Sequence, residues 1–266
     1  MTDIRPRKEE TDARPRATRV GDRAEVTADC TAANLLTAAR VTLTENSSAI
    51  FAALADVLTP APEGARILSS QWESAQAIGT GTIGARTVIT RVHRAADTQV
   101  ARTVEITDTA GQAVAHGEQL WSWPVDADSS PHTDFCTSQW GALLRDSLNE
   151  DLEFTAPLST WDGSIGLRCN DIGSSTREIH LRIYRGSVID VAPRTPAGAT
   201  FTFVASAQQW CDIALGPTND FMRRAISGDF SSAGNGYEYV RLTRPLSVIM
   251  SHVKSLAGQR NERPAS

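Results

Sequence analysis

Residues 197–216 read AGATFTFVASAQQWCDIALG, and residues 220–230 follow with DFMRRAISGDF. The first run opens with the alternation of a half-buried strand and continues into a short helix that carries Trp210 and ends at Gly216. The second run predicts another helix, stopped by Ser-Gly, and then a short strand. A last helix begins near RLTRPL, at residues 241–246. Strands and helices mix in this order, which predicts an α+β fold.

The residues before this stretch continue the same pattern. A helix is expected over 135–147, and strands are expected over 163–169, 178–184, 187–191 and 200–204. Between 178 and 184, three aliphatic residues alternate with His180, Arg182 and Tyr184. One face of this sheet should therefore be buried and the other should be wetter.

In order and spacing, the segment from about residue 135 to 256 resembles the sterol carrier protein type 2 domain. That family encloses an apolar tunnel for lipids and acyl chains, so the resemblance implies a hydrophobic small molecule as ligand. The candidates for lining such a tunnel share large apolar side chains: Trp161, Phe201, Phe203, Trp210, Phe221 and Met222. Any single one of them could equally fill an ordinary core.

The N-terminal half predicts one helix among antiparallel strands. Residues 47–58 carry four apolar side chains at helical spacing, between serines that can cap the start and Pro60, which ends it. Strands are expected over five segments, and a DTAG turn joins the last two as a hairpin. The five segments are 23–30, 66–76, 79–92, 98–107 and 113–123. A helix wrapped by a curved antiparallel sheet is the hot-dog arrangement.

This half, about residues 20–124, resembles hot-dog acyl-CoA thioesterases of the phenylacetate-pathway type. The resemblance rests on AIFAALAD at 49–56, VARTVEITD at 100–108 and GQAVA at 111–115. It implies an acyl-CoA or acyl-carrier-protein substrate, and a homodimer, because the sites of such enzymes usually form between two protomers.

The resemblance also implies a catalytic carboxylate on the central helix, and Asp56 stands at that position. In the family, free N–H groups at the helix start polarise the thioester carbonyl. Asn46, Ser47 and Ser48 lie there, either as donors to the carbonyl or as ordinary helix caps. Glu73 faces either a shared pocket or solvent. Where the family has His-Gly-Gly, residues 47–49 read Ser-Ser-Ala, and glycine would allow a closer approach of the substrate.

Composition excludes several other classes of protein. The chain has 266 residues, is 41% hydrophobic and carries a net charge of −5, which does not suit a nucleic-acid partner. Four scattered cysteines and five dispersed histidines show no metal-ligand spacing, so we expect no metal and no cofactor. No apolar run is long enough to span a membrane, and the lone thiols favour the cytoplasm.

The chain divides at its polar segments. We expect a disordered leader over 1–20, a hot-dog-like domain over 21–124, a linker over 125–134, a sterol-carrier-like domain over 135–257 and a tail over 258–266.

Three functions fit these features. The first is a thioesterase-like enzyme that uses Asp56 as base or nucleophile and holds the acyl, polyketide or lipid part of its substrate in the C-terminal tunnel. The second is a non-catalytic carrier of lipids or other hydrophobic small molecules, which the absence of His-Gly-Gly favours. The third is a natural-product pathway enzyme whose pocket confines a reactive intermediate.

Overall fold

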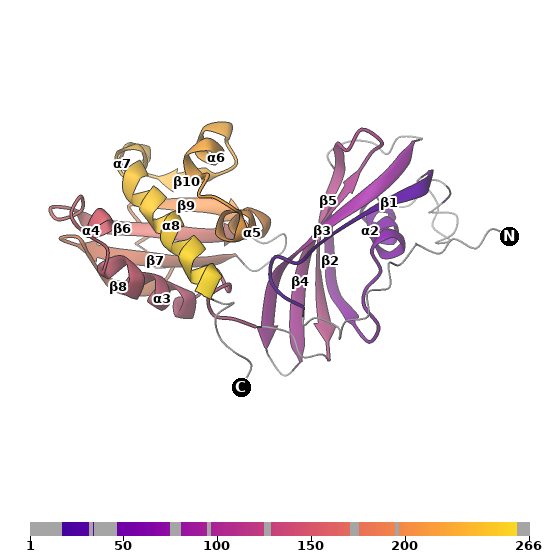
Figure 1. Ribbon diagram of the computed structural model, residues 1–266, viewed down its shortest axis with the longest axis horizontal. Helices are drawn as coiled ribbons and strands as arrows, with labels where there is room; N and C mark the ends of the chain where they lie inside the picture. The colour runs from indigo at the N-terminus through magenta and orange to yellow at the C-terminus, as the bar shows by residue number, and fades with distance from the viewer. Residues whose placement is uncertain are drawn as a thin grey trace.

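The computed structural model describes residues 18–31, 34, 47–74, 81–94, 97–124, 129–170, 176–194 and 197–259. Most of the expected leader, Asn46, residues 125–128 of the expected linker and residues 260–266 of the tail lie outside these ranges. The described residues form an α+β protein with two five-stranded sheets, one in each half of the chain (Figure 1). The expected fold class is therefore confirmed.

The first sheet has the strand order β1-β3-β4-β5-β2, and all its neighbouring strands are antiparallel. Helix α2 packs on one face of this sheet and buries Phe51 and Leu54 against Val104 and Ile106. The hairpin turn forms as expected, since the Asp108 side chain accepts hydrogen bonds from two backbone N–H groups of the turn. The elements are β1 (Arg23–Thr31), α2 (Ser47–Leu58), β2 (Arg66–Ser74), β3 (Thr82–Arg94), β4 (Thr98–Thr107) and β5 (Ala113–Trp123).

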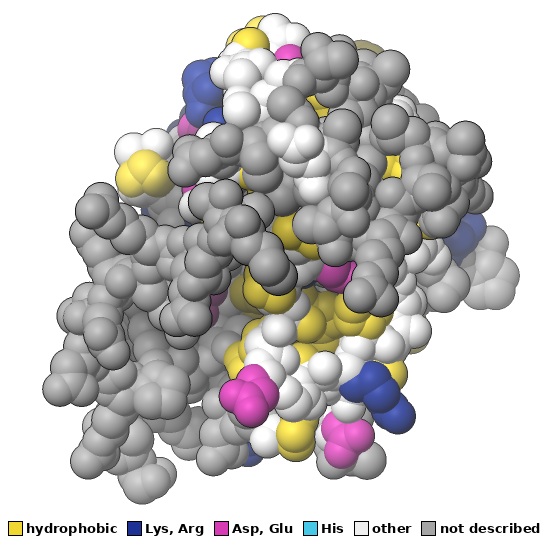
Figure 2. All heavy atoms as spheres, turned by 90° about the vertical axis from the view of Figure 1, so that its right-hand side faces the viewer, with side chains coloured by type: hydrophobic (Ala, Val, Ile, Leu, Met, Phe, Trp, Pro, Cys, Tyr) yellow, Lys and Arg dark blue, Asp and Glu magenta, His cyan; other side chains and the backbone are white. Residues whose placement is uncertain are grey.

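Strand β2 lies at the edge of this sheet and pairs only with β5 among the described strands. Ile67 pairs with Trp121 and Ser69 pairs with the preceding residue of β5, so Leu68 is the extra residue of a β-bulge. Eight of the nine residues of β2 are exposed. Figure 2 views the molecule from the side of this half and shows hydrophobic side chains gathered at its surface. Among the described residues of this half, the exposed large hydrophobic side chains are those of Val57, Ile67 and Leu68.

The second sheet has the order β10-β9-β6-β7-β8, in which β6 and β9 are parallel and the other pairs are antiparallel. Helices α3 and α8 lie across one face of it (Figure 1). The strands are β6 (Asp162–Asn170), β7 (Arg177–Tyr184), β8 (Ser187–Pro193), β9 (Phe201–Ser206) and β10 (Ser231–Gly234). The helices are α3 (Ser138–Asn149), α4 (Leu152–Thr155), α5 (Ala207–Leu215), α6 (Phe221–Ser227), α7 (Gly236–Arg241) and α8 (Thr243–Gln259).

One prediction about this sheet was wrong. His180 was assigned to the wetter face, but it is 4% exposed and its Nε2 lies 2.8 Å from Glu178 Oε1. Arg168 donates to the other oxygen of Glu178 at 2.8 Å, so the buried polar groups satisfy one another. Burial alone would raise the pKa of Glu178, but the hydrogen bonds from Arg168 and His180 outweigh it and hold this pKa below its ordinary value.

The two halves are in contact through α5 and the linker. Thr103 on β4 donates to Gln208 Oε1 on α5 at 3.1 Å. Asp134, within the expected linker, accepts from Arg91 on β3 at 2.8 Å and from Arg177 on β7 at 3.3 Å. The described part of the linker therefore takes part in the contact between the two sheets.

Candidate functional site

The candidate base Asp56 lies in the last turn of α2, on an exposed part of the helix. Its Oδ1 accepts a hydrogen bond of 3.3 Å from the side-chain amide of Gln119 on β5. The helix thus presents a carboxylate to solvent, and the sheet beneath it supplies a donor.

The buried guanidinium of Arg102 lies next to Gln119, on the side away from Asp56. Arg102 on β4 is 4% exposed, and its Nε and Nη2 donate to Gln119 Oε1 at 2.8 and 2.5 Å. Its Nη2 also donates to the Thr59 carbonyl, just after the end of α2, at 2.7 Å. The guanidinium lies over the ring of Trp121, 4.1 Å from the centroid, which suits a cation–π contact.

Within the described ranges, Arg102 donates only to the neutral Gln119 and Thr59, so its charge is compensated there through dipoles, a ring and the more distant Asp56. Burial lowers the pKa of Arg102 to about 10, and the negative charge of Asp56 opposes this effect. Arg102 therefore remains protonated at neutral pH. Leaving the buried Arg102 charge without these partners would cost free energy, so the contacts hold Gln119 and the end of α2 against β4.

The candidate carbonyl-binding residues are at the other end of α2. Ser47 and Ser48 are its first two residues, described by their backbone, and Asn46 lies outside the described residues. Asp56 stands eight positions after Ser48, which is about 12 Å along the axis at 1.5 Å per residue. The two ends of one α2 are therefore too far apart to act on one thioester group.

Glu73 is exposed on β2 and lines a pocket of about 260 Å³ at the contact between the halves. Its cross-strand neighbour His116 also lines this pocket. A second pocket, of about 340 Å³, opens beside Arg23 and Arg86, and Gln208 borders both. Both pockets are walled by the face of the first sheet that α5 contacts.

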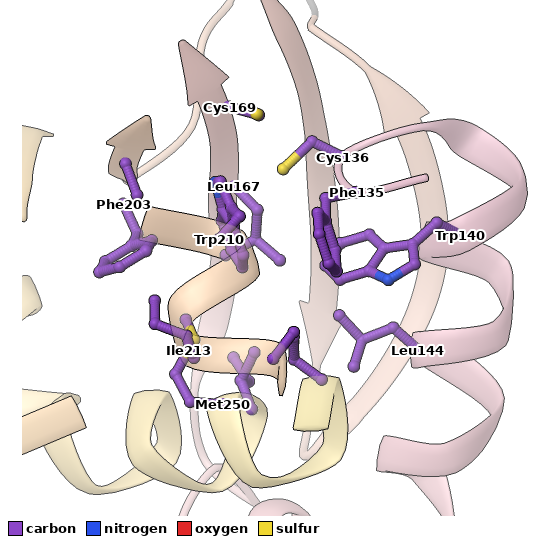
Figure 3. Packing of buried hydrophobic residues seen from close by; sticks show 14 of the residues in the cluster. Phe135, Cys136, Trp140, Leu144, Leu167, Cys169, Phe203, Trp210, Ile213 and Met250 are labelled. Atoms are coloured by element: carbon purple, nitrogen blue, oxygen red, sulfur yellow. The ribbon is translucent and has the colours of Figure 1, made fainter. Parts of the chain in front are cut away.

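The tunnel candidates of the C-terminal half pack against one another. Phe201, Phe203, Trp210 and Phe221 are completely buried. The Phe203 ring centroid lies 5.5 Å from that of Trp210 and 6.0 Å from that of Phe221, and Figure 3 shows Phe203 and Trp210 within the packed interior. These rings fill the space between the second sheet and its helices.

Of the other two tunnel candidates, Trp161 belongs to the same buried cluster and Met222 does not. Trp161 is 7% exposed, and its indole N–H donates to Glu238 at 2.9 Å. Met222 is 48% exposed, on the outer side of α6. The structure thus brings five of the six candidates into one buried cluster and places Met222 at the surface.

A further polar chain was not foreseen from the sequence. Ser147 Oγ lies 2.5 Å from His252 Nδ1, and His252 Nε2 lies 2.7 Å from Asp151 Oδ2. The residue types are those of a serine hydrolase triad, but the two ring nitrogens are exchanged, since in that triad Nε2 faces the serine. However, Ser147 stands in the last turn of α3, where free carbonyls rather than free N–H groups lie, so the end of its own helix offers no oxyanion donors. We interpret these hydrogen bonds as a structural link between α3 and α8. The hydrogen bond from His252 lowers the pKa of Asp151.

Among the described residues, no group of three or more His, Cys, Asp or Glu side chains has the arrangement of a metal site. Within the same ranges, no helix is both long and apolar enough to cross a bilayer. Cys136, Cys169 and Cys211 are buried.

No family model and no curated protein sequence matches the chain. Solved structures match about half of it each. A conserved hypothetical protein of Thermus thermophilus, described as possibly a sterol carrier protein, is 18% identical with a TM-score of 0.39, over 50% of this chain and 94% of its own. An R-hydratase of Pseudomonas aeruginosa is 18% identical with a TM-score of 0.31, over 41% and 83%. The E. coli PaaI protein from the phenylacetic acid degradation operon is 14% identical with a TM-score of 0.29, over 40% and 79%.

Proposed function

We propose that the protein hydrolyses acyl thioesters, with residues 21–124 as a hot-dog-like catalytic half and residues 135–257 as a sterol-carrier-like half. The observation that carries the proposal is the exposed Asp56 carboxylate, which is hydrogen-bonded to Gln119 and backed by the buried Arg102. The Asp56 carboxylate, which is open to solvent, takes a proton from water as the water oxygen attacks the thioester carbon. The carbon–sulfur bond then breaks and the proton passes from Asp56 to the departing sulfur, giving a carboxylic acid, a free thiol and the original carboxylate.

Negative charge develops on the carbonyl oxygen in this reaction, and it needs fixed donors. The N-terminus of α2 supplies them in this proposal, through backbone N–H groups and the residues 46–48. Because that end is about 12 Å from Asp56 of the same helix, the complete site requires the helix end of a second copy.

The exposed edge of β2 suits the pairing of two such copies. If β2 pairs antiparallel with its symmetry mate about Ser70, with both bulges kept, Arg66 faces the partner's Glu73 and Ile67 faces the partner's Trp72. Arg66 and Glu73 lie on the same face of the sheet, and Ile67 and Trp72 share the other. Among the described residues, Arg66 and Glu73 form no ion pair within one copy, so both are available to a partner. We propose a homodimer with this register.

Charge reversal tests the register. Arg66→Glu and Glu73→Arg each place like charges opposite one another twice in the dimer, and the double variant restores both pairs. Sedimentation equilibrium should show weaker dimers for the single variants and recovery for the double variant. Equal association of all four proteins would reject this register.

In the proposal, the C-terminal half takes the apolar part of the substrate. The Phe203, Trp210 and Phe221 rings are in mutual contact, so an acyl chain enters among them only if they separate. Hydrolysis is tested by incubating the full chain with acyl-CoA esters from two to eighteen carbons and measuring released thiol. If none of the esters released thiol, the proposal would be contradicted.

The second candidate is a carrier of lipids or other hydrophobic molecules without catalysis. It is favoured by the side chains at residues 47–49, where the matching position of the hot-dog enzymes has two glycines. Native mass spectrometry of the purified protein separates the two, because a carrier retains an apolar ligand and releases it unchanged.

A further inference from the structure

The side-chain amide of Gln119 connects the buried cation to the candidate base. Its oxygen accepts from Arg102 and its nitrogen donates to Asp56. Gln119 itself is completely buried, so it has no competing contact with bulk water.

This arrangement is directional. A guanidinium has donors and no acceptor, so the Gln119 oxygen must face Arg102, and the Gln119 nitrogen must then face the other way. Arg102 is itself fixed by the Thr59 carbonyl and by the Trp121 ring. Three contacts therefore determine which end of the amide points at Asp56.

We propose that Gln119, oriented by Arg102, is a positioning residue that aims the Asp56 carboxylate, an inference that rests on the proposed hydrolysis. The hydrogen bond from Gln119 is the one that the Asp56 carboxylate accepts from the described residues. An exposed aspartate rotates broadly about its terminal torsion. Since a general base works only within hydrogen-bond reach of its proton, fixing this torsion raises the fraction of bound substrate that reacts.

The sharpest variant is Gln119→Glu. Glutamate has nearly the same shape and still accepts hydrogen bonds from Arg102, so the buried cation keeps a partner. It replaces the donor that faces Asp56 with a second carboxylate oxygen, which repels the base. Gln112→Glu, in the exposed hairpin turn, adds the same charge away from the site and is the matched control.

We expect Gln119→Glu to lower kcat by about tenfold to a hundredfold with KM little changed, as for loss of a hydrogen bond to a charged group. Gln112→Glu should behave as wild type. In an Asp56→Asn background, Gln119→Glu should have no further effect on kcat, because it acts through the Asp56 carboxylate.

The outcomes separate this inference from the proposed function. If Asp56→Asn lowers kcat and Gln119→Glu does not, Gln119 does not position the base and only the inference fails. The same holds if the two losses multiply in the double variant. If Asp56→Asn turns over as wild type, the proposed function fails as well. Unfolding of Gln119→Glu in urea is measured in parallel, and a folded variant with normal KM and reduced kcat supports positioning.

Discussion

Replacing Phe203 by alanine distinguishes a packed core from an open tunnel. The Phe203 side chain is completely buried, and its ring lies 4.9 Å from Phe230, 5.5 Å from Trp210 and 6.0 Å from Phe221, centroid to centroid. Truncation removes all three ring contacts and leaves a cavity. Loss of a buried phenylalanine costs about 3–5 kcal/mol.

Urea unfolding followed by tryptophan fluorescence measures this cost. With a urea slope of about 2–3 kcal/mol per molar, the midpoint should fall by about 1–2 M. Met222→Ala is the control, because this side chain is half exposed, and surface changes usually stay within about 0.5 kcal/mol. If Phe203→Ala costs less than about 1 kcal/mol, the ring does not fill a packed core, and an open cavity lies beside it.

Two further predictions concern other parts of the structure. Gly186→Ala should destabilise the protein more than Gly198→Ala. Both glycines have positive φ, but a Cβ at Gly186 would lie 2.4 Å from the Thr155 carbonyl oxygen, whereas a Cβ at Gly198 would have nothing within 4 Å. Equal unfolding midpoints of the two variants would contradict this prediction. The hydrogen bond from His252 lowers the pKa of Asp151, so it stabilises the fold above the ordinary carboxyl pKa, and this stabilisation is lost as the pH falls through the lowered value. His252→Gln should therefore make the free energy of unfolding less dependent on pH at acid pH. The same pH dependence in both proteins would show that the His252–Asp151 contact contributes nothing.

The strand and helix order could be predicted from the sequence because it depends on local periodicity. The alternation in 98–107 and the serine and proline signals around 47–58 correspond to β4 and α2, with the same ends. The hairpin turn could also be predicted, since Asp108 and Gly111 supply its side-chain acceptor and its positive φ.

The surroundings of Asp56 could not be predicted in this way. Arg102 occupies an inward position of β4, in phase with Val100, Val104 and Ile106, and this phase was the available signal. A strand pattern indicates that such an arginine lies inside, but it does not indicate which residues accept its hydrogen bonds. Gln119 and Thr59 come from other elements, and only the fold brings them to Arg102. Likewise, the burial of His180 depends on Glu178 and Arg168, which alternation alone does not reveal.

The most direct test of the account is the turnover number of Asp56→Asn on the best acyl-CoA ester, compared with wild type and with Asp108→Asn, which changes an exposed turn. Removing a general base typically costs a factor of about 10² to 10⁴. We predict a loss in this range for Asp56→Asn, with near wild-type turnover for Asp108→Asn. Equal turnover of Asp56→Asn and wild type would contradict the assignment of Asp56 as the base.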